Sequence, residues 1–193
     1  MQRSLQGLVL VLASSLMLLS NAAETITPLP QYEVDTEWPQ LPVEWKLGDP
    51  SSFAVDADDN VWLVHRPRTL SDEDYPSAAP PVIAFNTTGE VINAWGGSGS
   101  GYQWPQREHF IHVDYQGFVW IGGNYCPDRN LPRLQAENDD QILKFSPEGE
   151  LLLQIGRSNG SGGNDDMSNL HQPADVMVDP ATDELYVADG YGN

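Results

Sequence analysis

The feature that most constrains the fold is a repeated pair of short apolar runs, rich in β-branched and aromatic residues, with a polar turn between them. The three copies occupy residues 53–64, 111–121 and 176–187. Each copy carries an aspartate at the same place, and these residues, Asp56, Asp114 and Asp179, lie 58 and 65 residues apart. Two runs of this kind joined by a tight polar turn predict a β-hairpin.

The first two copies continue with two further apolar runs. These runs occupy residues 81–85 and 91–96 in the first copy, and residues 141–145 and 151–156 in the second. Four antiparallel strands in each repeat predict an all-β fold built from β-propeller blades, whereas unrelated sandwich strands would not repeat the same motifs in the same order. The blades are expected at about residues 50–97 and 108–157, with half of a third blade at about 173–193, in a partial propeller over residues 35–193.

The third copy contains only its first two strands, because the sequence stops at Asn193. An open stack of blades leaves sheet edges and an apolar face uncovered, and propellers avoid this by closing into a ring of typically 4–8 blades. We therefore expect an N-terminal fragment of about two and a half blades. The alternative is a natural half-propeller that pairs with a second chain.

The first residues have the layout of a secretory signal peptide. A basic start with Arg3 precedes an apolar run over residues 8–19 and small residues that end near Ala22. This predicts a signal peptide over residues 1–22 and export to the periplasm or the extracellular space. A membrane anchor is the alternative, but the run is shorter than the roughly 20 apolar residues that a span needs. Residues 23–34 are expected to be a flexible leader.

The net charge of the chain indicates which kinds of partner it can bind. The chain has 28 acidic residues against nine lysines and arginines, which gives a formal net charge of −19. Such a surface repels nucleic acid and anionic membranes, so we expect a small-molecule or peptide ligand and, for the full-length protein, a monomer. The sequence has one cysteine, Cys126, so no disulfide can form within it. A free thiol and a bond to another molecule both remain open.

Residues 56–60, Asp-Ala-Asp-Asp-Asn, resemble a calcium-binding loop in their acidic side chains. They lack the glycine and the distal glutamate of an EF-hand loop. A hairpin turn explains them better.

The three copies resemble NHL repeats. The third copy, residues 172–193 with its ending Val-Ala-Asp-Gly-Tyr-Gly-Asn, resembles the propeller of peptidyl-α-hydroxyglycine α-amidating lyases (peptidylamidoglycolate lyases) and their bacterial relatives. Residues 38–42, residues 64–66 and residues 108–114 match the same group. The resemblance implies a six-bladed ring and a central zinc held by three histidines from different blades, with calcium nearby. It also implies cleavage of a peptidyl-α-hydroxyglycine to a peptide amide and glyoxylate.

Three positions match functional residues of that family. Tyr191 matches the tyrosine that acts as the catalytic base, Arg66 matches the arginine that engages the substrate carboxylate, and His109 matches a zinc histidine. All three would fall at corresponding ends of their blades, near the ring axis. The remaining zinc histidines would lie beyond Asn193.

The sequence also departs from the family at three places. Phe110 follows the zinc histidine where the family has glycine, and Pro67 follows the arginine where the family favours glycine. Residues 122–125, Gly-Gly-Asn-Tyr, stand where the family has a strand end that contains aspartate. These departures put the identity of the site in doubt.

The residues by themselves leave other interpretations open. Arg66 suits an ion pair with a carboxylate as well as a substrate carboxylate. Tyr191 suits an ordinary strand-end aromatic, since a base needs a pKa below the usual value of about 10. His109 and His112 are three apart, so on one strand they would face opposite sides, unless His109 lies in the preceding loop. His112 is then expected to face a neighbouring sheet.

Two functions remain open on the sequence. The first is an exported, zinc-dependent carbon–nitrogen lyase, and the alternative is a non-enzymatic propeller that binds a ligand or a protein. Propellers host both kinds of function, so the fold cannot choose between them. A sugar-lactone hydrolase of similar architecture has no motif support.

Overall fold

A computed structural model describes residues 29–126 and 133–191. The chain divides into two units, residues 1–34 and residues 35–193. The signal peptide predicted for residues 1–22, and the first half of the predicted leader (residues 23–28), lie outside the described residues. Residues 29–34 are exposed and form no helix or strand. Within the described ranges, no helix has the length and apolar character needed to cross a bilayer.

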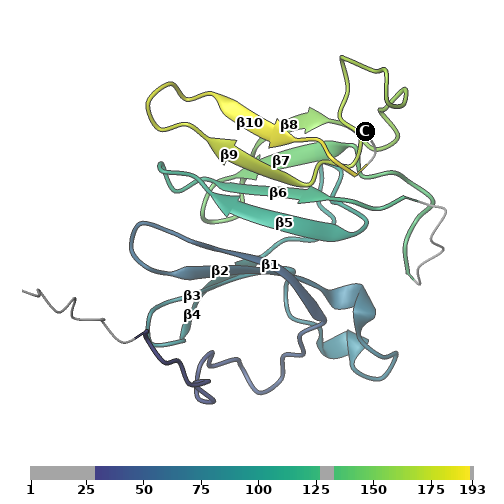
Figure 1. The fold of residues 1–193 in the computed structure, drawn as a ribbon. Coiled ribbons are helices and arrows are strands. Elements are labelled where there is room, and N and C mark those ends of the chain that lie inside the picture. Colours follow the sequence, from purple (N-terminus) through teal and green to yellow (C-terminus); the bar gives the residue numbers. More distant parts are fainter. Residues whose placement is uncertain (1–28, 127–132, 192–193) are drawn as a thin grey trace, which may run out of the picture. The chain divides into compact units, whose positions relative to one another are not determined.

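The second unit contains two four-stranded antiparallel sheets and a third hairpin (Figure 1). The first sheet consists of β1 (Asp49–Val55), β2 (Val61–Arg66), β3 (Val82–Phe85) and β4 (Val91–Trp95), in that order. The second sheet consists of β5 (Glu108–Val113), β6 (Val119–Gly123), β7 (Gln141–Phe145) and β8 (Leu151–Gly156), in that order. The third hairpin is a separate two-stranded sheet of β9 (Asp175–Val178) and β10 (Leu185–Ala188). Each sheet is a simple meander, as in a propeller blade. The predicted all-β fold of four-stranded blades is confirmed.

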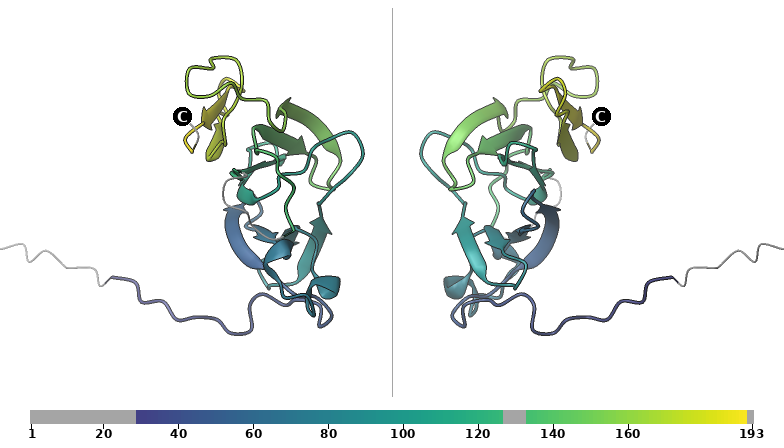
Figure 2. Two further views of the ribbon diagram at one scale, coloured as in Figure 1. Left: turned by 90° about the vertical axis from the view of Figure 1, so that its right-hand side faces the viewer. Right: turned by 90° about the vertical axis from the view of Figure 1, so that its left-hand side faces the viewer.

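The second sheet lies between the first sheet and the third hairpin (Figures 1 and 2). Alternate residues of β5 divide between two apolar cores: Ile111 and Val113 pack with side chains of the first sheet, whereas Phe110 packs with Val176 of β9. Every residue of β6 is buried because both faces of this sheet are covered. Side chains at the ends of β5 are therefore held between two neighbouring elements.

The segment before β1 packs on the first sheet. Trp38, Leu41 and Trp45 pack against a core that includes Ile83 and Phe85 of β3. The backbone of this segment also pairs with the first sheet, because a parallel β-bridge links Gln40 to Glu90, the residue before β4. This packing covers part of the outer face of the first sheet.

Asp56 and Asp114 organise the turns of the first two hairpins. In each turn, Oδ1 accepts hydrogen bonds from two backbone N–H groups, and Oδ2 accepts the indole N–H of the tryptophan six residues later, Trp62 or Trp120, at 2.9 Å. The carboxylates are thus used within the hairpins. The interpretation of residues 56–60 as a turn is correct.

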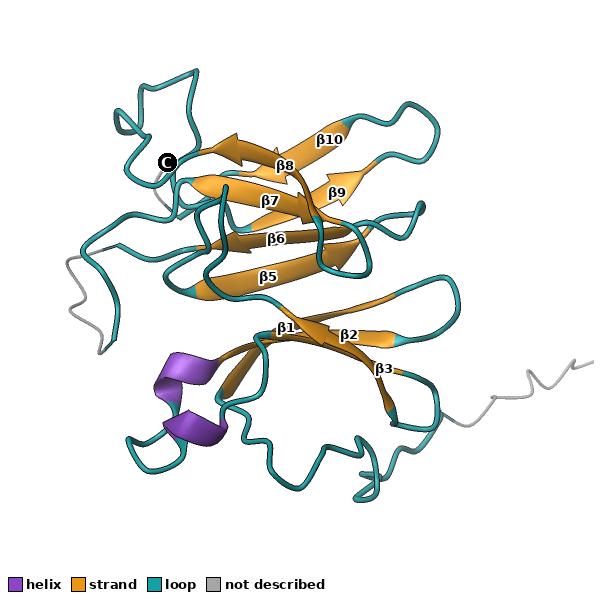
Figure 3. Cartoon of the chain, turned by 180° about the vertical axis from the view of Figure 1, so that it is seen from behind, coloured by secondary structure: helices purple, strands orange, loops and turns teal. Residues whose placement is uncertain are grey.

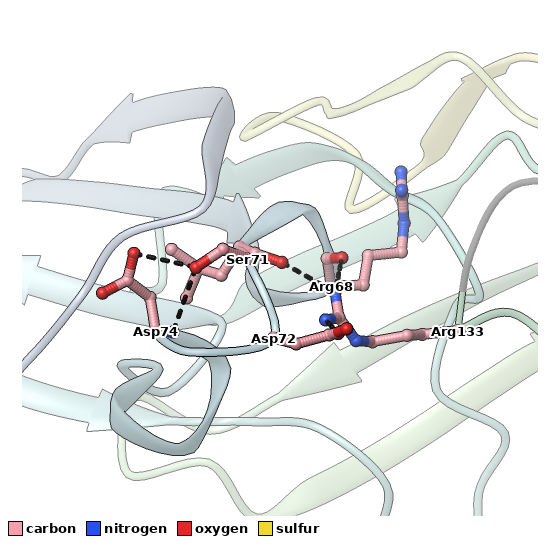
Figure 4. Close-up of polar contacts among 6 residues, drawn as sticks. Arg68, Ser71, Asp72, Asp74 and Arg133 are labelled. Atoms are coloured by element: carbon pink, nitrogen blue, oxygen red, sulfur yellow. Dashed lines mark hydrogen bonds and ion pairs between the residues drawn. The ribbon is translucent and has the colours of Figure 1, made fainter.

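In each sheet a long insertion separates the second strand from the third. The first insertion covers residues 67–81 and the second covers residues 124–140, and described residues of the two are in contact. The first insertion forms two single-turn 3-10 helices, η1 (Pro67–Thr69) and η2 (Tyr75–Ser77) (Figure 3). Arg133 of the second insertion donates to the carbonyl oxygens of Arg68 and Leu70, both at 2.7 Å, and forms an ion pair with Asp72 (Figure 4). Its guanidinium also lies 4.5 Å from the centre of the Tyr75 ring. Arg133 therefore joins the two insertions.

Candidate functional site

Two of the three predicted site residues are in contact. His109 lies near the start of β5, and Tyr191 follows β10. The Tyr191 hydroxyl is 2.9 Å from Nε2 of His109, in a hydrogen bond, and the rings meet edge to face with centres 4.9 Å apart. Tyr191 is half exposed. The packing of the third hairpin on β5 brings these residues together.

A β-bulge orients His109. The pairing of β5 with β6 shifts register between Glu108 and Phe110, so His109 is the extra residue. Such an extra residue changes the alternation of side chains and re-aims the strand end. The negative charge of Asp175 on β9 opposes the lowering of the pKa values of both His109 and His112 by burial. Strict alternation of side chains does not apply across this bulge, so the spacing of three residues does not by itself place His109 and His112 on opposite sides of β5.

Arg66 supports this bulge. It ends β2, and its Nε donates to the carbonyl oxygen of Glu108 at 2.8 Å, while its Nη2 donates to Oγ of Ser51 at 2.8 Å. The Ser51 hydroxyl is in turn 2.9 Å from the carbonyl oxygens of Glu108 and His109. Among the described residues, Arg66 forms no ion pair with a carboxylate. Its contacts join the third predicted site residue to the backbone of His109.

The surroundings of His109 favour the neutral form of its imidazole. Burial lowers the pKa of His109, and the positive charges of Arg66 and Arg107 lower it further, against a smaller opposite effect of Asp175. Nδ1 of His109 is buried and has no hydrogen-bond partner among the described residues. A neutral imidazole is the form that binds a metal or accepts a proton.

A pocket of about 360 Å³ adjoins Arg66. We call it the arginine pocket, and its lining residues are Asp49, Arg66, Arg68, Thr69, Leu70, Arg107 and Arg133. Arg68 and Arg107 were not predicted from the sequence as site residues. Each lies two residues from a predicted site residue in a chain that has only nine lysines and arginines, and this proximity could have indicated them.

Phe110 and Gly122, two of the residues that depart from the family pattern, pack against each other. Phe110 pairs with Gly122 across β5 and β6. A Cβ atom on Gly122 would lie 2.2 Å from Cε1 of Phe110, so the aromatic ring occupies the space that this glycine leaves. The Phe110 side chain is buried in the core beneath the third hairpin. The bulky residue after His109 therefore packs into the fold instead of blocking the site.

The part of the chain that the structure describes contains no group of three or more histidine, cysteine, aspartate or glutamate side chains that could hold a metal ion. His65, one of the other histidines, is fully buried: its Nδ1 accepts the N–H of Gly48 at 3.2 Å, and its Nε2 lies 2.9 Å from the carbonyl oxygen of Pro80. His65 is thus a packing residue. His109 remains the one predicted metal ligand that the described residues place beside Tyr191.

The sequence is similar to peptide-amidating enzymes. It is 30% identical over 176 residues to peptidyl-glycine alpha-amidating monooxygenase B of Xenopus laevis, over 83% of this chain and 18% of that protein. Identity is 27% over 175 residues with monooxygenase A of the same frog, and 26% over 177 residues with the enzyme of Rattus norvegicus, each over 83% of this chain. The predicted resemblance to amidating enzymes is confirmed. The chain spans less than a fifth of the length of these relatives.

Solved structures with some likeness to the chain include a gluconolactonase from Xanthomonas campestris and virginiamycin B lyase from Staphylococcus aureus. Each covers 73% of this chain with a TM-score of 0.40, at 14% and 12% identity, and this chain covers 35% and 34% of them. No protein-family model matches the chain.

Proposed function

We propose that this chain supplies part of the active site of an exported propeller lyase, which cleaves a peptidyl-α-hydroxyglycine to a peptide amide and glyoxylate. The hydrogen bond between Tyr191 and His109 carries the proposal, because it joins two residues that the resemblance assigns to one reaction. The similarity to amidating enzymes over 83% of the chain supports the choice of reaction.

The reaction needs a base and a route for a proton. The Tyr191 oxygen takes the proton of the substrate hydroxyl, the carbonyl of glyoxylate forms, and the C–N bond breaks with its electron pair moving to nitrogen. The nitrogen then takes up a proton to give the peptide amide. The neutral imidazole of His109, 2.9 Å away, is placed to accept the phenolic proton and so make Tyr191 a stronger base.

Arg66 has the chemistry to bind the carboxylate of the α-hydroxyglycine. A guanidinium has five N–H donors in a planar fork. Two of its nitrogens hold the bulge of His109, and the side chain also lines the arginine pocket. A carboxylate bound by Arg66 would therefore lie near the β-bulge that orients His109.

Zinc fits this site only in part. The neutral His109 imidazole suits a zinc ligand, and its Nδ1 has no partner among the described residues. An imidazole that binds zinc through Nδ1 carries its proton on Nε2, so with zinc bound His109 would donate to the Tyr191 oxygen instead of accepting its proton. The described residues also contain no complete set of ligands. A bound zinc would act as a Lewis acid and stabilise developing negative charge on oxygen. The steps above use the residues of this chain alone.

The alternative is a propeller that binds a peptide or another ligand through the same residues without a reaction. The half-exposed position of Tyr191 and the arginine pocket suit that function as well. The two proposals differ in whether the bound peptide is cleaved.

The test uses the intact protein and a synthetic peptidyl-α-hydroxyglycine, with glyoxylate and peptide amide measured as products. Tyr191→Phe should reduce glyoxylate release by at least about 100-fold, since a positioned base contributes 10²–10⁴-fold. Tyr186→Phe is the matched control, because Tyr186 is also half exposed but its hydroxyl contacts Glu184. Equal activity of the two variants would contradict the role of Tyr191.

A further inference from the structure

The arginine pocket gathers positive charge in an acidic protein. Four of the nine lysines and arginines line this one pocket, while the chain has 28 acidic residues. Arg66, Arg68 and Arg107 repel one another, and burial together with this repulsion lowers the pKa values of Arg66 and Arg68. Such a cluster weakens the fold unless a negative group offsets the repulsion.

Two of the arginines are already engaged in structural contacts. Arg133 forms an ion pair with Asp72 and donates to two carbonyl oxygens of the first insertion. Arg66 uses Nε and Nη2 to hold the β-bulge. These contacts stabilise the walls of the pocket.

Arg68 and Arg107 have few partners. Both Nε atoms are buried, and neither has a hydrogen-bond partner among the described residues. In Figure 4 the Arg68 side chain extends away from Arg133, and no dashed line reaches its guanidinium. Arg107 donates from Nη1 to the neutral amide of Asn124 at 3.3 Å. These two guanidinium groups can thus bind an anion.

No carboxylate forms an ion pair with Arg66, Arg68 or Arg107 among the described residues. Asp49 lines the pocket. The Glu108 side chain is buried, and its Oε1 accepts the indole N–H of Trp104 at 2.9 Å. Asp139 accepts three backbone N–H groups, and burial raises its pKa to about 7. Among the described residues that line the pocket, Asp49 is thus the one carboxylate beside four arginines, of which Arg133 already pairs with Asp72.

We propose that Arg68 and Arg107 form a second anion subsite beside Arg66, which binds an acidic side chain of the peptide substrate. The proposal rests on the proposed function, in which Arg66 binds the α-hydroxyglycine carboxylate. A pocket of about 360 Å³ has room for one short acidic side chain, and Arg66, Arg68 and Arg107 all line it. A carboxylate here gains charge-assisted hydrogen bonds that a neutral amide of the same shape does not.

The experiment compares two peptidyl-α-hydroxyglycines that differ only in Glu or Gln at the residue before the α-hydroxyglycine. For the intact wild-type protein, kcat/KM should be about tenfold higher for the Glu peptide, as expected for one charge-assisted contact. Arg68→Gln and Arg107→Gln should each bring this ratio toward one, because the Glu peptide loses a charge-assisted contact that the Gln peptide does not make. Arg157→Gln, the same change of charge at an exposed site outside the pocket, should keep the wild-type ratio.

Binding of the same two peptides, measured by calorimetry, separates the two proposals. If no glyoxylate is released but the Glu peptide binds about tenfold more tightly than the Gln peptide, the lyase proposal fails and the subsite stands. If the wild-type protein processes or binds both peptides equally, the subsite is excluded. This comparison needs no variant, so it holds even if an arginine substitution disturbs folding.

Discussion

Tyr191 and His109 share a hydrogen bond of 2.9 Å although 82 residues separate them along the chain. Neither residue belongs to a local motif with the other. Their contact depends on the β-bulge in β5 and on the packing of the third hairpin over Phe110 and Trp120. The fold of three consecutive repeats thus builds a pair of side chains suited to proton transfer.

The first prediction concerns coupling within this pair. Because each side chain acts through the other, His109→Ala and Tyr191→Phe should not have additive effects on glyoxylate release. The double variant should be about as active as His109→Ala alone, as found for residues that work as a unit. His109→Ala should also lower the zinc content of the intact protein, measured by metal analysis. Additive losses with unchanged zinc would argue against this pair.

A second prediction concerns Gly122. Gly122→Ala places a methyl group against the buried ring of Phe110, so it should lower the free energy of unfolding by about 1–3 kcal/mol, as overpacked cores do. The same substitution in a Phe110→Ala background should cost less, because the ring is absent. Urea denaturation of the four proteins measures this difference. An equal cost in both backgrounds would show that Gly122 serves another purpose.

A third prediction compares the two aspartate turns. Trp120→Phe removes the indole N–H that Oδ2 of the buried Asp114 accepts, and this should cost about 1–3 kcal/mol of unfolding free energy. Trp62→Phe should cost less, because Asp56 is half-buried and its Oδ2 still accepts a hydrogen bond from the side chain of Asn60 at 3.0 Å, whereas Oδ2 of the buried Asp114 retains the longer ion pair with Lys144 at 3.7 Å. Both tryptophans are buried, so the loss of area is matched. The reverse order would contradict the role given to these turns.

A fourth prediction concerns pH and His65. Burial lowers the pKa of this histidine below its ordinary value of 6.5, so the unfolded chain binds a proton below pH 6.5 while the folded ring stays neutral. The unfolded state then holds more protons, and the free energy of unfolding should fall as the pH drops, by at most about 1.4 kcal/mol per pH unit.

Asp139 acts in the opposite direction. Burial raises its pKa to about 7, so its contribution to stability grows as the pH falls from about 7 toward its ordinary value of 3.8. His65→Gln removes one titrating group and keeps Asp139. The free energy of unfolding, measured in urea as the pH is lowered from about 7.5 to about 5, should therefore decrease less for His65→Gln than for the wild type. Equal slopes would show that His65 does not stay neutral in the fold.

Much of the fold could be predicted from the sequence, because the apolar runs and polar turns of a blade are local patterns that recur. The bulge could not, since nothing in the residues around His109 shows where the register of β5 shifts. The positions of Arg66 and Tyr191 came from resemblance alone. The arginine pocket was missed because the insertion that carries Arg133 and the strand ends that carry Arg66 and Arg107 are far apart in the chain.

The measurement that tests the central claim most directly is product analysis with the intact wild-type protein and a peptidyl-α-hydroxyglycine. The proposed lyase should release glyoxylate and peptide amide in equal amounts, faster than the uncatalysed reaction, as the peptide disappears. A peptide that binds but is recovered unchanged, with no glyoxylate above background, would contradict the lyase and favour the binding propeller.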